Sequence, residues 1–352
     1  MKRHIPNIGF CVPELKRALM VLLPTIVLAV LTKDAIWLQA SVMTMATFVA
    51  QERTDLAPLG VLAHSLAILA ALTVLLLAHP SKVFFVSAVV ALAIACIRLT
   101  ALGAELRTLG SFTFVPALYL SMELSSPGTD GRLQQLSTLL PVLLTGCVPT
   151  IIASATAHAR TVSKETSALA HYLRLFSSLD HGERQESWLV VASMAIAVLA
   201  TAVLVEALHA KDGQWMIWSA ATVVTAEVAG SRNKLYQRCL GALFGVPIGF
   251  GMGLLVPVSP LLHSICLVIS LLTLVALRNY VFSFGARCMF IALAAALIGE
   301  GSTVSVERAA DVVIGGCFGL ISVAFLSQTY KLFAATKNGR QALSHHGHRP
   351  TH

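Results

Sequence analysis

Apolar runs follow one another along almost the whole chain, and short polar segments separate them. A helix that crosses a lipid bilayer needs about 20 mostly apolar residues, and several of these runs approach that length. The pattern predicts an all-α fold, a polytopic membrane helix bundle with about 12 transmembrane helices. The predicted spans are residues 18–31, 36–49, 59–78, 83–97, 109–122, 136–158, 188–208, 215–229, 239–256, 261–276, 286–298 and 309–328.

The basic residues divide unequally between the two sides of such a bundle. If the predicted spans alternate in direction, 20 of the 25 Lys and Arg residues fall on the side of the N-terminus. Loops rich in Lys and Arg stay in the cytoplasm, so this bias places both termini there. The few basic residues on the opposite side are Lys33, Lys82, Arg132, Lys211 and Arg308.

The two halves of the chain repeat a pattern of one tryptophan and three hydroxyl residues. The pattern has the spacing i, i+4, i+7 and i+10, and its two copies lie 178 residues apart. This spacing places the four side chains on one helical face. We therefore predict two parallel six-helix repeats, whose shared interface would line a transport path. The two stripes are Trp37, Ser41, Thr44 and Thr47, and Trp215, Ser219, Thr222 and Thr225.

The repeats also set the predicted domain boundaries. The first transmembrane repeat covers residues 1–158 and the second covers residues 188–330. Between them, residues 159–187 form a polar connection whose apolar side chains fall on one helical face. This pattern predicts a cytoplasmic amphipathic linker, which lies on the membrane surface or packs on the bundle. Residues 331–352 form a polar cytoplasmic tail.

The hydroxyl stripes have two interpretations. As a substrate path, they would bind a carboxylate or phenol by hydrogen bonds, and the tryptophans would stack on an aromatic ring. As packing groups, Ser and Thr bond to backbone carbonyls and bridge helices, while Trp marks the membrane interface. The sequence leaves both interpretations open.

A glycine ladder follows the second stripe. Gly241, Gly245, Gly249 and Gly253 recur at every fourth residue, which strips one helical face of side chains. Such a face lets another helix approach closely, so we predict a helix-packing role. The partner helix belongs either to the same chain or to a second copy in a homo-oligomer. In the first half, His64 stands at the position that corresponds to Gly245.

Two sets of charged residues are candidates for transport chemistry. Four arginines near the predicted cytoplasmic ends of spans are expected either to attract an anion or to anchor the helices by the positive-inside rule. They are Arg98, Arg107, Arg278 and Arg287. Proton coupling needs a group that titrates inside the membrane, which makes Glu227 and His64 the candidates. The competing interpretations are a salt bridge of Glu227 with Arg232 or Lys234, and a neutral buried His64.

Composition narrows the class further. Hydrophobic residues make up 56% of the chain and charged residues 12%, and the mean hydropathy is +0.79. The net charge of +8 sits in short loops, so we attribute it to membrane topology and predict no nucleic-acid partner. The seven cysteines are scattered singly, without metal-ligand spacing. We find no motif for a metal site, a cofactor or an enzyme active site.

Several motifs together resemble a known family. A Trp-led span with Ser and Thr at its core is followed by a basic turn, then by Arg238 and the glycine ladder. The C-terminal stretch ERAADVVIGGCFG contains Arg308 followed by Gly315, Gly316 and Gly319. These elements resemble the fusaric acid resistance-like, aromatic acid exporter superfamily. The chain differs from the larger members of that family in having a linker where they carry a sizeable cytoplasmic domain.

The resemblance implies a function and its partners. It implies an inner-membrane protein of bacteria that exports small aromatic or hydrophobic carboxylates, such as fusaric acid or hydroxybenzoates. It also implies proton coupling, a periplasmic adaptor protein and a homo-oligomer. An organic-anion channel without proton coupling is the alternative, because a plant branch that resembles this superfamily conducts organic anions. The lipid bilayer and a small organic acid are thus the expected partners.

Overall fold

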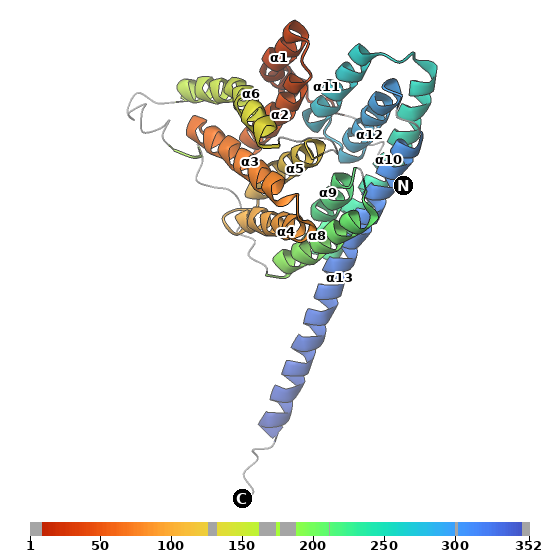
Figure 1. Ribbon diagram of the computed structural model, residues 1–352. Helices are drawn as coiled ribbons and strands as arrows, with labels where there is room; N and C mark the ends of the chain where they lie inside the picture. The colour runs from red at the N-terminus through yellow and green to blue at the C-terminus, as the bar shows by residue number, and fades with distance from the viewer. Residues whose placement is uncertain are drawn as a thin grey trace, which may run out of the picture.

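The computed structural model describes residues 9–125, 132–161, 174–176, 188–210, 212–299 and 302–346. Within these residues the chain forms twelve α-helices and a short 3₁₀ turn, Leu99–Ala101, and it forms no named strand. The predicted all-α helix bundle is therefore confirmed (Figure 1). Most of the predicted linker, residues 159–187, lies outside the described residues.

Six helices make up the first half of the chain. Helices α1 and α2 both end at a residue with positive φ, Lys33 at 55° and Asp55 at 48°, where the chain turns back sharply. Helix α3 begins with Pro58, whose fixed φ and missing N–H suit the first position of a helix. The helices are α1 (Val12–Thr32), α2 (Ile36–Thr54), α3 (Pro58–Ala78), α4 (Lys82–Arg98), α5 (Leu106–Glu123) and α6 (Arg132–Thr161).

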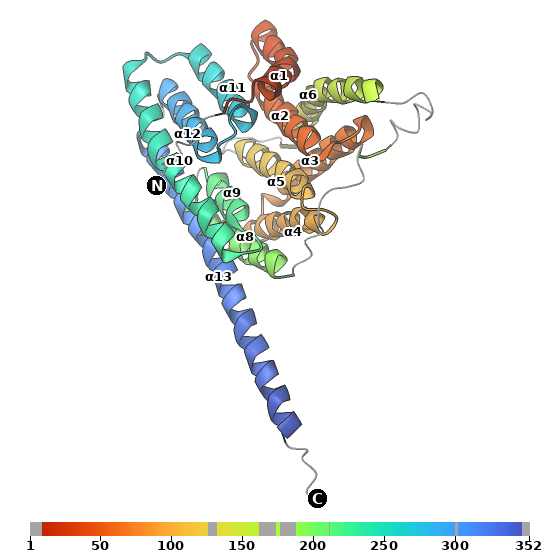
Figure 2. The same ribbon diagram turned by 180° about the vertical axis from the view of Figure 1, so that it is seen from behind.

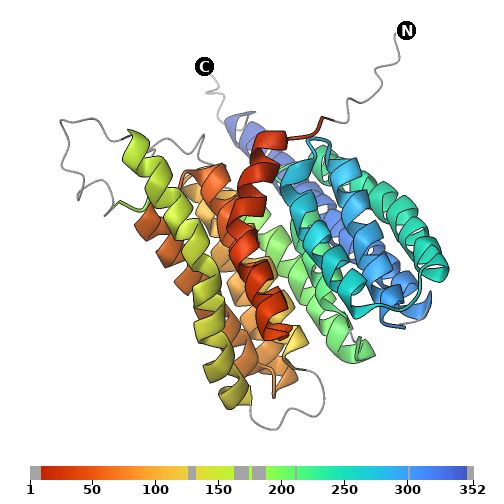
Figure 3. The ribbon, with the colours of Figure 1, turned by 90° about the horizontal axis from the view of Figure 1, so that it is seen from above.

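Six further helices make up the second half, and Figure 3 shows the two halves side by side. They are α8 (Trp188–Leu208), α9 (Gln214–Val223), α10 (Val228–Leu255), α11 (Pro260–Ala276), α12 (Tyr280–Leu297) and α13 (Ser302–His346). The last helix extends well beyond the bundle in both Figure 1 and Figure 2. It continues through much of the segment that was predicted as a polar tail.

The helices of the two halves make matching contacts. In the first half α3 packs on α5, and α6 packs on α2 and α3. In the second half α10 packs on α12, and α13 packs on α9 and α10. Between the halves, α4 contacts α8 and α1 contacts α11, which are equivalent pairs in the order of the chain.

Helix α9 is shorter than the predicted span 215–229. It ends at Val223, and a new helix begins at Val228. Ser231 stabilises the break, because its hydroxyl accepts a hydrogen bond from the backbone N–H of Thr225 at 3.1 Å. The Thr225 hydroxyl in turn donates to the carbonyl of Glu227 at 2.7 Å. These local side-chain bonds offer the backbone an alternative to the helix, which the hydrophobic pattern does not reveal.

The glycine ladder packs α10 closely against α12. A Cβ atom at Gly245 would overlap the carbonyl oxygen of Gly285, and one at Gly249 would overlap that of Met289. A side chain at Gly253 would likewise collide with Ala296. The ladder is therefore used within the chain, and it gives no reason by itself to expect an oligomer.

Seven of the described helices are long and apolar enough to cross a membrane: α1, α3, α4, α6, α8, α10 and α13. The others, α2, α5, α9, α11 and α12, are shorter or more polar. The twelve described helices agree with the predicted number of about 12, and they are of two kinds, seven long and apolar and five shorter or more polar. The exposed side chains include many large apolar ones, as a lipid-facing surface requires.

The glycine ladder can be tested by adding single methyl groups. We expect Gly245→Ala to lower the thermal stability of the purified protein, because overpacking costs about 1–3 kcal/mol. The matched control is Gly251→Ala on the same helix, where an added Cβ meets nothing within 4 Å. Equal melting temperatures for the two variants in detergent would contradict the close α10–α12 packing.

Candidate functional site

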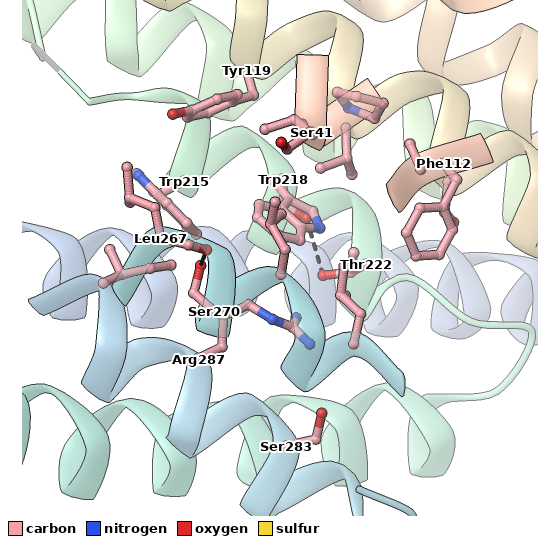
Figure 4. A pocket seen from close by; sticks show the side chains of 18 of the residues that line it. Ser41, Phe112, Tyr119, Trp215, Trp218, Thr222, Leu267, Ser270, Ser283 and Arg287 are labelled. Atoms are coloured by element: carbon pink, nitrogen blue, oxygen red, sulfur yellow. Dashed lines mark hydrogen bonds between the residues drawn. The ribbon is translucent and has the colours of Figure 1, made fainter. Parts of the chain in front are cut away.

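A cavity of about 750 Å³ lies between the two halves of the chain. Its walls come from α2 and α5 of the first half and from α9, α11 and α12 of the second, with a few residues from α10 and α13. These five main helices are the ones that are too short or too polar to count as membrane spans. Figure 4 shows side chains from several of them converging on a common space.

Aromatic rings line the middle of the cavity. The rings of Trp215 and Trp218 stack with centroids 5.2 Å apart and an interplanar angle of 29°. Tyr119 and Phe112 come from α5 on another wall (Figure 4). Tyr280, from α12, also lines the cavity. Flat, apolar walls of this kind suit an aromatic ligand.

Arg238 presents its charge to this cavity. Its side chain is 2% exposed, and in the described part of the chain it forms no ion pair with a carboxylate. Its Nε donates to the Ser219 hydroxyl at 3.3 Å and its Nη1 to the Tyr280 hydroxyl at 3.1 Å. The guanidinium lies 4.4 Å from the ring centroid of Phe284 and 5.8 Å from that of Trp218. Its Nη2 has no hydrogen-bond partner.

A buried charge without a counter-ion is costly, so Arg238 is a candidate for binding an anion. A carboxylate in the cavity would accept a hydrogen bond from the free Nη2 and neutralise the guanidinium. Polar and aromatic groups on three of its sides already hold the guanidinium in place.

Basic residues dominate the cavity as a whole. Most of them lie toward the end of the bundle where α1 begins, which we call the N-terminal end. Arg287 is held by a hydrogen bond from its Nε to the Thr273 hydroxyl at 3.2 Å, and Arg107 donates to the carbonyl of Val224. The basic lining residues are Arg53, Arg107, Lys234, Arg238, Arg278, Arg287 and Arg308, and the acidic ones are Glu123 and Asp212.

The opposite end of the cavity has a different character. Here Asp212, just before α9, pairs with Arg308 of α13 across 3.8 Å. The Arg308 guanidinium lies over the ring of Trp215, 5.5 Å from its centroid. The acidic residue Glu123, at the end of α5, also lines this region.

The cavity includes part of the predicted substrate path. Ser41, Trp215 and Thr222 line it. The other members of the two stripes do not: Trp37, Thr44, Thr47, Ser219 and Thr225. The stripes are therefore divided between the cavity and the contacts of the helices around it.

The remaining hydroxyls of the stripes bridge helices. Thr44 of α2 donates to the carbonyl of Gly146 on α6 at 2.6 Å. Ser219 of α9 donates to the carbonyl of Val312 on α13 at 2.6 Å. Thr47 bonds to Thr150 of α6 at 3.3 Å. These are the packing contacts that formed the competing interpretation of the stripes.

Of the four predicted anion-attracting arginines, Arg107, Arg278 and Arg287 line the cavity. Arg98 lies at the end of α4, where it is exposed and outside the cavity lining. Sequence spacing placed all four at helix ends, but it does not tell which helix faces inward.

The two predicted coupling residues both lie outside the cavity lining. Glu227 is exposed at the N-terminal boundary of α10. His64 is 5% exposed between α3 and α5, and its Nε2 lies 3.1 Å from the Thr113 hydroxyl of α5. His64 thus joins the first-half helix pair that corresponds to the glycine-packed pair α10 and α12.

The sequence identifies Arg238 only as part of a motif, and it does not indicate that Tyr119 and Tyr280 line a cavity. Arg238 lies just before the predicted span 239–256, where an arginine is expected to be an interface anchor. Helix α10 begins already at Val228, so Arg238 lies about three turns inside it. An arginine that precedes a glycine ladder on a long helix is the signal that could have revealed it.

These features define a multi-pass membrane protein whose polar, cationic cavity is enclosed by apolar helices. The family described as "Fusaric acid resistance protein-like" matches residues 196–322, from within α8 into α13. The match supports the family assignment made from the motifs, and it includes Arg238, Arg308 and the glycine ladder. No curated protein and no solved structure matches the chain.

The anion site can be tested by removing its charge. We expect Arg238→Met to weaken binding of 4-hydroxybenzoate at least about tenfold, because a hydrogen bond to a charged group contributes about 1.5–3 kcal/mol. Equilibrium dialysis of the purified protein measures the affinity. Arg98→Met makes the same change outside the cavity and should leave the affinity unchanged; an equal loss in both variants would refute a specific site at Arg238.

The division of the hydroxyl stripes predicts opposite effects for two identical substitutions. Thr44→Val should lower stability by about 1 kcal/mol, because the Gly146 carbonyl loses its bond from α2. Thr222→Val should leave stability nearly unchanged, since the Thr222 hydroxyl bonds only within its own helix, and should alter ligand affinity. Thermal unfolding and equilibrium dialysis of both variants separate the two roles, and a pair of variants with the same profile would contradict the division.

Proposed function

We propose that this protein is a secondary transporter that exports small aromatic or hydrophobic carboxylates across the bacterial inner membrane. The observation that carries the proposal is the buried, unpaired guanidinium of Arg238 among the aromatic rings of the cavity. A carboxylate attached to a ring matches both features, because the charge would pair with Arg238 and the ring would lie against Trp218. The family match supports the same class of substrate.

The arrangement of the halves supports a transport mechanism. The matching helix contacts in the two halves are those expected of two parallel six-helix repeats, and the cavity lies between them. In transporters built from repeats, the substrate binds at such an interface and the repeats move against each other. With the termini in the cytoplasm, the basic residues at the N-terminal end would draw anions from the cytoplasm into the cavity.

We further propose that the proton gradient drives export. The structure favours neither Glu227 nor His64 as the coupling group, since both lie outside the cavity lining. Asp212, Glu123 and His263 are the acidic and histidine residues that line it in the described part of the chain. These three are the first residues to test for coupling.

An organic-anion channel is the second candidate. One observation favours it: the cavity is lined by residues from both ends of the bundle, from Arg278 at the N-terminal end to Asp212 at the other. A path that opens at both ends at once would conduct anions down their gradient without protons.

Transport by the purified protein in proteoliposomes distinguishes the candidates. We expect radiolabelled 4-hydroxybenzoate to accumulate against its gradient when a pH gradient is imposed, and a protonophore to abolish the accumulation. Cyclohexanecarboxylate and 4-hydroxybenzyl alcohol serve as competitors that lack the aromatic ring or the carboxylate. Arg238→Met should lose the flux, while Arg98→Met should keep it.

Each other outcome has a defined meaning. Flux that follows only the substrate gradient would replace the transporter with the channel. Equal competition by the alcohol would contradict carboxylate recognition. Absence of flux for every carboxylate tested, with and without a periplasmic adaptor protein, would overturn the proposed function.

A further inference from the structure

The end of the cavity opposite the N-terminal end contains a second arginine with a free donor. In Arg308, the Nη2 atom faces the Asp212 carboxylate, but the Nε atom is buried and has no hydrogen-bond partner. The ion pair is long, at 3.8 Å, and the side chains of Arg308 and Asp212 are 20% and 17% exposed. Both residues line the cavity.

Trp215 supplies another free donor at the same place. Its Nε1 is buried without a hydrogen-bond partner, and the residue is only 9% exposed. The Arg308 guanidinium lies over its ring. Two buried N–H groups that have no hydrogen-bond partner among the described residues are costly unless a ligand satisfies them.

The two arginines are connected by the tryptophan pair. Arg308 lies over Trp215, Trp215 stacks on Trp218, and Trp218 lies beside Arg238. The cavity thus has a guanidinium with a free N–H at each end of a stacked aromatic pair. An aromatic carboxylate could slide along the rings and exchange one guanidinium for the other.

Asp212 makes the surroundings of Arg308 different from those of Arg238. Arg238 has no carboxylate partner in the described residues, whereas Arg308 already has one. Near Asp212 lies a further acidic group, Asp311 of α13, which interacts electrostatically with both Asp212 and Glu307. Tyr119 and Glu123 of α5 belong to the same electrostatic cluster.

We propose that Arg308 and Trp215 form a second carboxylate-binding position, the exit position, at which Asp212 competes with the substrate for Arg308. The substrate's carboxylate would accept hydrogen bonds from the Arg308 guanidinium and from Trp215 Nε1. When Asp212 returns to Arg308, it displaces the carboxylate and releases the substrate at the far end of the cavity. No covalent bond or proton transfer is needed, since one anion replaces another on the same cation.

The competition makes the two ends of the cavity differ in how tightly they hold the substrate. Binding at Arg238 meets no internal competitor, so the substrate is held there more tightly than at the exit position. The carboxylates around the exit repel an anion that approaches from the far side. This inference rests on the proposed function, because it assigns a release step to the same substrate.

The test removes the competitor without changing its shape. In an Arg238→Met background, in which the exit position remains, we expect Asp212→Asn to bind 4-hydroxybenzoate about tenfold more tightly in equilibrium dialysis, which corresponds to roughly 1.4 kcal/mol. We also expect the single variant Asp212→Asn to export more slowly in proteoliposomes, because release becomes limiting. The matched control is Asp34→Asn, an exposed aspartate in the loop between α1 and α2 that lies outside the cavity and whose carboxylate accepts a hydrogen bond from the N–H of Ile36. It should change neither quantity.

A second variant tests the position itself. Trp215→Phe keeps an aromatic ring and removes the N–H donor, so in the Arg238→Met background it should weaken binding both with Asp212 present and with the Asp212→Asn substitution. Unchanged or weaker binding on Asp212→Asn in that background would overturn the competition. If the variant with Asp212→Asn does not yield folded protein, unchanged binding by Trp215→Phe in the Arg238→Met background overturns the exit position.

These outcomes separate the inference from the proposed function. Wild-type protein that neither binds nor transports any aromatic carboxylate overturns both. Wild-type transport that is abolished by Arg238→Met, together with an unaffected Asp212→Asn, overturns the exit position alone.

Discussion

The structure depends on shielding a group of buried positive charges from lipid. A guanidinium such as that of Arg238 is far too costly to expose to hydrocarbon, so each charged side chain must turn toward the interior of the bundle. The five shorter or more polar helices form most of the cavity wall, and the apolar helices α10 and α13 contribute Arg238 and Arg308 to it. The glycine-mediated contact of α10 with α12 serves this arrangement, because it brings Arg238 of one helix beside Tyr280 and Phe284 of the other.

Arginine and tryptophan together determine what the cavity can bind. The guanidiniums are held by rings and hydroxyls, and each keeps an N–H free. Such an arrangement keeps a charge available for a ligand, whereas an ion pair with a carboxylate would satisfy it permanently. Arg308 is the exception, because it forms a long ion pair with Asp212 at one end of the cavity. In the transport proposed above, binding and release would involve two different arginines.

Residues that match by sequence spacing in the two halves have different roles around the cavity. Thr44 and Thr222 correspond in the sequence, but the first bridges α2 to α6 while the second faces the cavity. Ser41 lines the cavity, and its counterpart Ser219 supports Arg238 and bonds to α13. His64 and Gly245 solve the same packing problem by a hydrogen-bonding side chain and by the absence of one. Two halves with matching helix contacts thus surround a cavity whose two ends differ in their residues.

The sequence by itself determined the class of the protein, because apolar runs, basic loops and glycine spacing reflect the bilayer and helix geometry directly. It also revealed the motif around Arg238 and the glycine ladder, and it named Ser41, Trp215, Thr222 and three of the arginines that line the cavity. Only the tertiary structure decided which face of each helix turns inward. Periodicity cannot tell a face that lines a cavity from one that bridges two helices, which is why Thr44 and Thr222 looked alike. The pairing of Asp212 with Arg308 depends on a contact between distant segments, and the break after Val223 on local side-chain bonds that the hydrophobic pattern does not show.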